Sequence, residues 1–117
     1  MRAWVLAAAV GLALAPAAFW HTALGQPADI KDPVVTERGH ALFNQRCAGR
    51  CHGLDGLEGF DAPILAGKDY LTFEFVIATL TGGRPNTAMP SWKDRLTDEE
   101  LRSVAAFVAT LGDAARK

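Results

Sequence analysis

The sequence of 117 residues is poor in cysteine, with two in the whole chain, and its formal net charge at pH 7 is only −1. A bridge between Cys47 and Cys51 would close so small a loop that it would restrain little of the unfolded chain, so a structural disulfide is possible but poorly placed. The near-neutral charge excludes an electrostatic binder of nucleic acid. Internal repeats and strand-like alternation are also missing. These absences leave a small helical domain whose thin core needs some other support.

One long uncharged run is present, over residues 3–20, but it is short for a membrane span. Small residues at 23–25 offer a signal-peptidase site, so we predict a secretory signal peptide over residues 1–25 and one domain over 26–117. The domain is then expected in the periplasm. The alternative is an uncleaved anchor, because the leader carries a single basic residue and a proline. Only an uncleaved anchor would attach the protein to a membrane.

The predicted domain begins with a sequence pattern that is typical of a helix N-terminus. Asp32 followed by Pro33 is typical of a helix cap and a first helical residue, and the apolar residues that follow share one face. This pattern predicts a helix that ends at about Cys47. Gly39 lies in the middle of this helix, where glycine costs roughly 1 kcal/mol relative to alanine. Either the cost is simply tolerated, or another element packs closely against the glycine.

Two further helices are predicted downstream. Apolar residues within 69–80 have helical spacing and are followed by a glycine pair, which predicts a second helix and its stop. Thr97 and Glu100 form a capping-box pattern at the start of a third helix, with Gly112 as its stop. The two intervening segments are rich in glycine and proline and are predicted to be ordered loops.

The string RCAGRCHG at residues 46–53 carries the chemistry. Two thiols immediately before a histidine are typical of covalent haem attachment, in which both thiols form thioethers and the histidine binds the iron. Cys47, Cys51 and His52 are the candidates, although three residues separate the cysteines where two are usual. Gly49 lies in this gap, and a positive φ there would absorb the extra residue as the end of the first helix. The string also fits an exported dithiol, or a zinc site whose fourth ligand is still to be found.

A haem iron that transfers electrons needs a second axial ligand, and Met89 is the only methionine besides Met1. It lies in a proline-rich loop and is followed by Pro90, which would stiffen the loop around the sulfur. A methionine more often fills a core, but a core position is unexpected in such a loop. For His40, on the first helix, a solvent-facing or hydrogen-bonded side chain is the commoner outcome. The residues therefore favour His52 and Met89 as the axial pair.

The chain resembles the class I c-type cytochromes of bacteria. The resemblance lies in the spacing of Gly39, Phe43 and Cys47, and in the strings CHGLDG (51–56), PILAG (63–67), AMPSW (88–92) and LTDEELRSVAAFVATL (96–111). It covers nearly all of residues 26–117. It implies an all-α fold of about three to four helices, with long loops wrapped around one covalently bound haem c.

The resemblance also implies roles for single residues. The first and last helices would cross at Gly39, where the ring of Phe107 would fill the space of the missing side chain, beside Phe43 and Val104. The carbonyl of Pro63 would accept the second ring N–H of the iron-bound histidine. The other implied pocket residues are Leu65, Ile64 and Trp92 as apolar walls, and Arg84, Tyr70 and Trp92 as donors to the haem propionates. A solvated loop arginine is the alternative for Arg84.

The function expected from this resemblance is single-electron transfer rather than catalysis, with no small-molecule substrate. Because His52 and Met89 together leave no open position on the iron, oxygen chemistry is not expected. The expected partners are redox proteins: a dehydrogenase, a cytochrome complex or a terminal oxidase. The chain would then be a soluble shuttle or the electron-accepting subunit of a periplasmic dehydrogenase. The alternatives are a haem-based redox or gas sensor, and a haem-free dithiol or zinc module.

Overall fold

The computed structural model describes Gly11 and residues 29–117. Its elements in chain order are the α-helix α1 (Pro33–Phe43), the π-helix η2 (Asn44–His52), the 3-10 turn η3 (Leu54–Gly56), and the α-helices α2 (Phe73–Gly82) and α3 (Asp98–Asp113). The described residues contain no strand, and the predicted all-α fold is confirmed. The predicted signal peptide lies outside the described residues apart from Gly11. No helix within the described part is long and apolar enough to cross a membrane.

Each α-helix begins at a capped residue. Asp32 accepts a hydrogen bond from the backbone N–H two residues on (2.9 Å), and Thr97 and Glu100 make both bonds of the predicted capping box (3.1 and 2.8 Å). Thr72 accepts from the backbone N–H three residues on (3.1 Å). This cap was not predicted, and because of it α2 begins directly after Thr72 rather than near residue 69.

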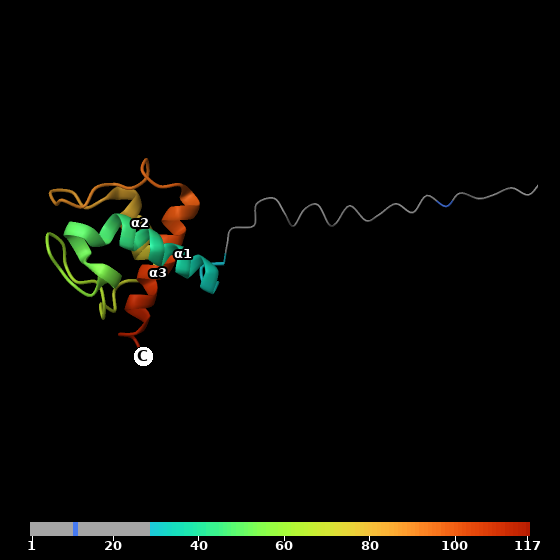
Figure 1. Cartoon of the computed structure of the whole chain (residues 1–117), viewed down its shortest axis with the longest axis horizontal. Helices are drawn as coiled ribbons and strands as arrows, with labels where there is room; N and C mark the ends of the chain where they lie inside the picture. The colour runs from blue at the N-terminus through green and yellow to red at the C-terminus, as the bar shows by residue number, and fades with distance from the viewer. Residues whose placement is uncertain (1–10, 12–28) are drawn as a thin grey trace, which may run out of the picture.

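The helices α1 and α3 cross at the centre of the domain, as Figure 1 shows. A Cβ atom at Gly39 would overlap the carbonyl group of Ser103, so the predicted crossing at this glycine is confirmed. The prediction that the ring of Phe107 fills the space beside Gly39 is wrong, because the backbone of α3 occupies that space. The ring of Phe107 lies further along, stacked on His40 at 4.5 Å between centroids and tilted against Phe43 at 5.3 Å.

The C-terminal end of α3 also differs from the prediction. Gly112 lies inside the helix, which continues to Asp113, so the glycine is not a stop. A Cβ at this position would lie 2.5 Å from the carbonyl oxygen of Leu71. The glycine therefore permits close packing of α3 against the segment that leads into α2.

The core lies between α1, α2 and α3 and is supplied mainly by α3. The apolar stripe predicted for this helix is buried, and its members are Leu101, Val104, Ala105 and Val108, with Leu111 partly buried beside them. The two long loops, residues 57–72 and 83–97, run on either side of η2 in the view of Figure 1. This arrangement leaves a space that both loops and all three α-helices border.

Candidate functional site

A cavity of about 490 Å³ lies between the helices and the two loops, within the size range of ligand sites. Nine of the ten predicted site residues line it: Cys47, Cys51, His52, Pro63, Leu65, Tyr70, Arg84, Met89 and Trp92. Ile64, predicted as a pocket wall, is not among the lining residues, and it is 45% exposed. Neighbouring side chains of an extended segment point to opposite sides, so Pro63 and Leu65 face the cavity and Ile64 faces away.

The π-helix η2 contains both cysteines and the histidine. The backbone N–H of Gly53 donates to the carbonyl of Ala48 at 2.8 Å, which is the i→i+5 bond of a π-helix. A turn of this kind holds more residues than an α-turn, so it accommodates the third residue between Cys47 and Cys51 without interrupting the helix. The predicted positive φ at Gly49 is therefore wrong, because the positive φ values among the described glycines lie elsewhere.

His52 is held in one orientation by the chain itself. It is 7% exposed, and its Nδ1 lies 2.8 Å from the carbonyl oxygen of Pro63, the contact that the resemblance implies. A carbonyl oxygen can only accept, so Nδ1 carries the hydrogen and Nε2 keeps its lone pair when the ring is neutral. His52 thus offers an oriented nitrogen ligand.

The thiols do not favour either haem-free alternative. Both cysteines are free in the structure. Burial raises the pKa of the Cys47 thiol to about 11, Cys51 adds to this rise, and Arg46 opposes it. Thiol exchange needs the thiolate, which burial disfavours at Cys47. Over the described residues, no group of three or more His, Cys, Asp and Glu side chains is arranged to hold a metal ion.

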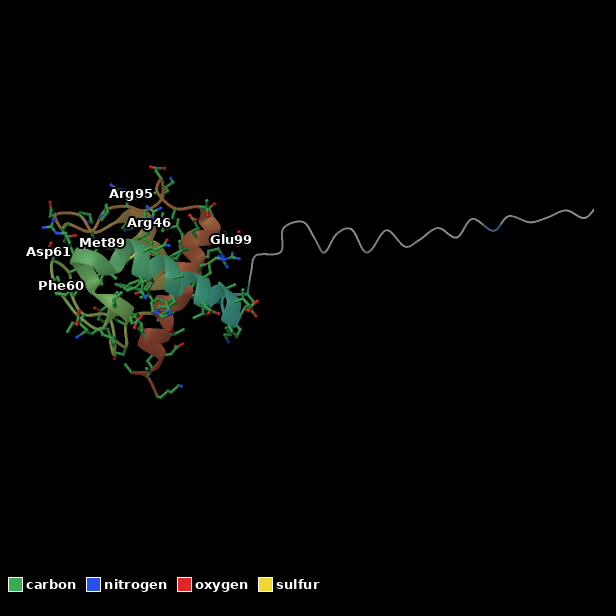
Figure 2. The ribbon with its side chains drawn as sticks, viewed as in Figure 1. Arg46, Phe60, Asp61, Met89, Arg95 and Glu99 are labelled. Atoms are coloured by element: carbon green, nitrogen blue, oxygen red, sulfur yellow. The ribbon has the colours of Figure 1, made fainter. Side chains whose placement is uncertain are left out.

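Met89 lies at the end of a short loop, residues 84–89, whose residues hydrogen-bond to one another. The N–H of Arg84 donates to the carbonyl of Met89 (3.1 Å), and the N–H of Met89 donates to Thr87 Oγ1 (3.2 Å). Thr87 in turn donates from its backbone and its hydroxyl to the carbonyl of Arg84 (3.2 and 2.7 Å). The side chain of Met89 is partly buried and packs against the core. Figure 2 shows Met89 near the upper edge of η2 in that view, on the same side as Arg46 of this helix.

Trp92 supplies a test of whether a haem fits the cavity. Its backbone N–H donates to the carbonyl of Leu80 (2.7 Å), but its buried Nε1 has no hydrogen-bond partner among the described residues. Buried N–H groups are rarely left unpaired, so an acceptor such as a carboxylate belongs beside this atom. An apolar cavity that also holds an imidazole, a thioether and two thiols fits a haem with its propionates.

Several residues that line the cavity were not predicted. The largest group comes from α2, which presents Phe75, Val76, Thr79 and Leu80 to the cavity. Their spacing by three and four residues was visible in the sequence as helical periodicity, but the direction of the face was not. Arg46 and Asp61 also line the cavity, and only their proximity to the attachment string pointed to them.

His40 lies outside the cavity and is not a competing ligand. It is half-exposed, and its Nε2 is paired with Oδ1 of Asp55. The prediction of a solvent-facing or hydrogen-bonded histidine is confirmed.

A protein family described as cytochrome c oxidase, cbb3-type, subunit III matches residues 35–108. The cbb3-type cytochrome c oxidase subunit CcoP of Rubrivivax gelatinosus is 37% identical over 98 residues, which cover 78% of this chain and 31% of that protein. Cytochrome c55X of Paracoccus denitrificans (strain Pd 1222) is 39% identical over 71 residues, covering 57% of this chain and 65% of that protein. Cytochrome c6 of Leptolyngbya boryana is 38% identical over 77 residues, covering 60% of this chain and 85% of that protein.

These similarities differ in how much of each relative they cover. The chain spans about a third of the length of the CcoP relatives that it matches. It spans most of the length of the cytochrome c6. No solved structure matches the chain.

Proposed function

The chain belongs to the c-type cytochrome family described as cytochrome c oxidase, cbb3-type, subunit III, and from this premise we propose that it is a periplasmic single-electron carrier. Proteins of this kind carry a covalently attached haem c and transfer electrons rather than catalyse a reaction. The haem supplies the one-electron change of its iron when it is bound. The residues of this chain then have to attach the haem covalently, bind its iron from both sides and exclude water from it.

Cys47 and Cys51 are the proposed attachment residues. Each thiol would hold the haem by adding its sulfur and its hydrogen across one vinyl group, a reaction that needs no oxidant. The observation that supports this role is the shared location of both cysteines on η2, where they line the same cavity as His52. The π-helical turn keeps the three residues on one continuous element despite the longer spacing.

His52 and Met89 are the proposed axial ligands. The hydrogen bond from Nδ1 to the Pro63 carbonyl fixes the imidazole and raises its basicity, which is the usual support of an iron-bound histidine. Met89 comes from the self-contained 84–89 loop on another wall of the cavity. A thioether ligand favours the ferrous state and gives a positive midpoint potential. With both ligands bound, no position remains open for oxygen.

The remaining predicted residues would complete the pocket. Trp92 Nε1 is the proposed donor to one propionate, because it is buried without a partner in the described part of the chain. Tyr70 and Arg84 also line the cavity and are proposed as further donors, Arg84 with a charge-assisted bond. Pro63 and Leu65 would cover the histidine side of the ring. The apolar lining keeps water from the iron and disfavours the extra charge of its ferric state.

The partners are proposed from the relatives. Several of them are named as subunits of a cbb3-type cytochrome c oxidase, which favours a terminal oxidase among the expected redox partners. A periplasmic dehydrogenase remains the alternative. The chain spans about a third of the length of these relatives, and the part proposed for it is the electron-transfer step. Purification with native partners distinguishes these cases: a co-purifying oxidase supports the first and a co-purifying dehydrogenase the second.

The experiment that tests the function starts from the full chain, expressed with an export and haem-attachment system. We expect a coloured periplasmic protein, a mass increase of one haem, a low-spin visible spectrum and a positive midpoint potential in redox titration. A colourless product without added mass refutes the proposal and favours a thiol module. Tight binding of carbon monoxide by the ferrous form, with loss of the low-spin spectrum, favours a sensor instead.

A further inference from the structure

A cluster of hydrogen bonds outside the cavity joins α1 and the first residue of η2 to the turn that follows His52. Asn44 Nδ2 donates to Asp55 Oδ1 (3.1 Å), and the backbone N–H of Asp55 donates to Asn44 Oδ1 (3.0 Å). His40 Nε2 is paired with the same carboxylate oxygen, and the His40 ring is stacked on Phe107 of α3. None of these residues lines the cavity. Two elements of the core thus hold Asp55 from outside the site.

Asp55 has an uncommon backbone conformation. Its φ is +58°, between two glycines of positive φ, Gly53 at +71° and Gly56 at +69°. A residue other than glycine is disfavoured in this left-handed region, and aspartate and asparagine tolerate it best. Such a conformation persists when the surrounding structure holds it. The bonds to Asn44 and His40 are the contacts that hold it here.

The held turn is connected directly to the partner of His52. The carbonyl of Gly56 accepts from the backbone N–H groups of Leu65 and Ala66, both at 3.0 Å. These two bonds fix the segment that begins with Pro63, whose carbonyl accepts from His52 Nδ1 at 2.8 Å. A short series of contacts therefore runs from Asn44 to the proposed iron ligand.

We propose that Asn44 and His40 are positioning residues, which act through Asp55 to hold the Pro63 carbonyl against His52 and so tune the midpoint potential. The proposal rests on the proposed function, in which His52 binds the haem iron. A hydrogen bond from Nδ1 makes the imidazole a stronger donor to the metal, and a stronger donor favours the ferric state. Loosening the Pro63 segment weakens this bond, so the midpoint potential rises.

Two substitutions distinguish the effect of holding Asp55 in position from the effect of its negative charge. Asn44→Ala removes two hydrogen bonds to Asp55 and changes no charge. Asp55→Asn removes the carboxylate charge but keeps an oxygen acceptor and a residue that tolerates positive φ. Arg38→Ala is the matched control, because it removes another contact of α1, the exposed ion pair with Glu99.

The experiment compares the haem-loaded proteins by redox titration and by NMR of the His52 Nδ1–H in the ferrous state. We expect this proton to exchange with solvent roughly tenfold faster in Asn44→Ala, the factor that corresponds to one lost hydrogen bond. The midpoint potential should rise in the same variant. Asp55→Asn should leave the exchange rate near that of the unchanged protein, and Arg38→Ala should change neither quantity.

Wild-type exchange and potential in Asn44→Ala would overturn the proposal. His40→Phe keeps it testable where Asn44→Ala does not accumulate, because this variant loses the bond to Asp55 and keeps an aromatic ring against Phe107. It should shift both quantities in the same direction, and unchanged values again count against positioning. A wild-type protein without haem would refute the proposed function itself. A haem-loaded wild type with unresponsive variants would refute only the positioning role.

Discussion

Gly39 meets the main chain of Ser103 so closely that a side chain at position 39 would overlap the Ser103 carbonyl. Gly39→Ala should therefore force α1 and α3 apart and lower the free energy of unfolding. Because the clash is with main-chain atoms, the cost of overpacking should lie at the upper end of its usual range, about 3 kcal/mol. The gain in helix propensity is about 1 kcal/mol, so we expect a net loss of roughly 2 kcal/mol. Denaturant unfolding measures it. Gly82→Ala is the control: nothing lies within 4 Å of a Cβ there, and its stability should not fall.

Ser103 provides a second test of the same helix crossing. Its side chain is 1% exposed, and its hydroxyl has no hydrogen-bond partner among the described residues. Ser103→Ala removes this unpaired group, so we expect a stability gain of about 1 kcal/mol. Ser91 is the matched comparison, because its hydroxyl donates to the Thr81 carbonyl at 2.6 Å. Ser91→Ala should lose about 1 kcal/mol, and equal effects of the two substitutions would contradict this account.

Met89→Ala tests the axial ligand. The substitution removes the one methionine that lines the cavity among the described residues and should leave one position of the iron open. We expect the ferrous protein to bind carbon monoxide, and the midpoint potential to fall because the stabilisation of the ferrous state is lost. Redox titration and visible spectra measure both effects. An unchanged spectrum would mean that another residue binds the iron.

Deletion of Gly49 tests the role of the π-helix. The residue is exposed, and nothing lies within 4 Å of a Cβ built on it. Its removal restores a two-residue spacing between the cysteines and allows η2 to continue as an α-helix. We expect the haem content, measured by mass and by visible spectrum, to stay near that of the full-length chain. Deletion of the exposed Gln45 is the control: it keeps the three-residue spacing, rotates the cysteines relative to α1, and should reduce haem content.

The carboxylate of Asp55 predicts a pH dependence of stability. Hydrogen bonds from His40 and then from Asn44 hold the pKa of Asp55 below its usual value of 3.8. A depressed pKa in the folded state means that the contribution is present above pH 3.8 and is lost as the pH falls through the folded-state pKa. Thermal unfolding of the unchanged protein and of Asp55→Asn between pH 2 and 7 should show the difference shrinking toward acid. A constant difference would contradict the assignment.

The sequence was sufficient to predict the elements that depend on local chemistry. The capping box of Thr97 and Glu100 forms as expected, and so does the apolar stripe of α3, because caps and periodicity involve residues within one or two turns. Nine of the ten candidate site residues also share one cavity. Their roles toward haem stay predictions until the experiments above are done.

Features that depend on packing between distant segments could not be predicted. The π-helix η2 is one such feature: the sequence shows a third residue between the cysteines, but not whether a left-handed glycine or a wider helical turn accommodates it. Gly112 looked like a stop because glycine often ends helices, but the Leu71 carbonyl gives it a packing role. The link between Asn44 and Asp55 joins residues eleven positions apart through a turn of unusual backbone conformation.

The 84–89 loop completes its hydrogen bonds within itself, and none of them uses the sulfur of Met89. Its shape is therefore set by the peptide alone, whatever charge the neighbouring iron carries. If Met89 binds the iron as proposed, a ligand mounted in this way would barely shift between the ferrous and ferric states, and the inner-sphere reorganisation energy would stay small. Fast electron exchange with successive partners would then require no gating motion of this loop.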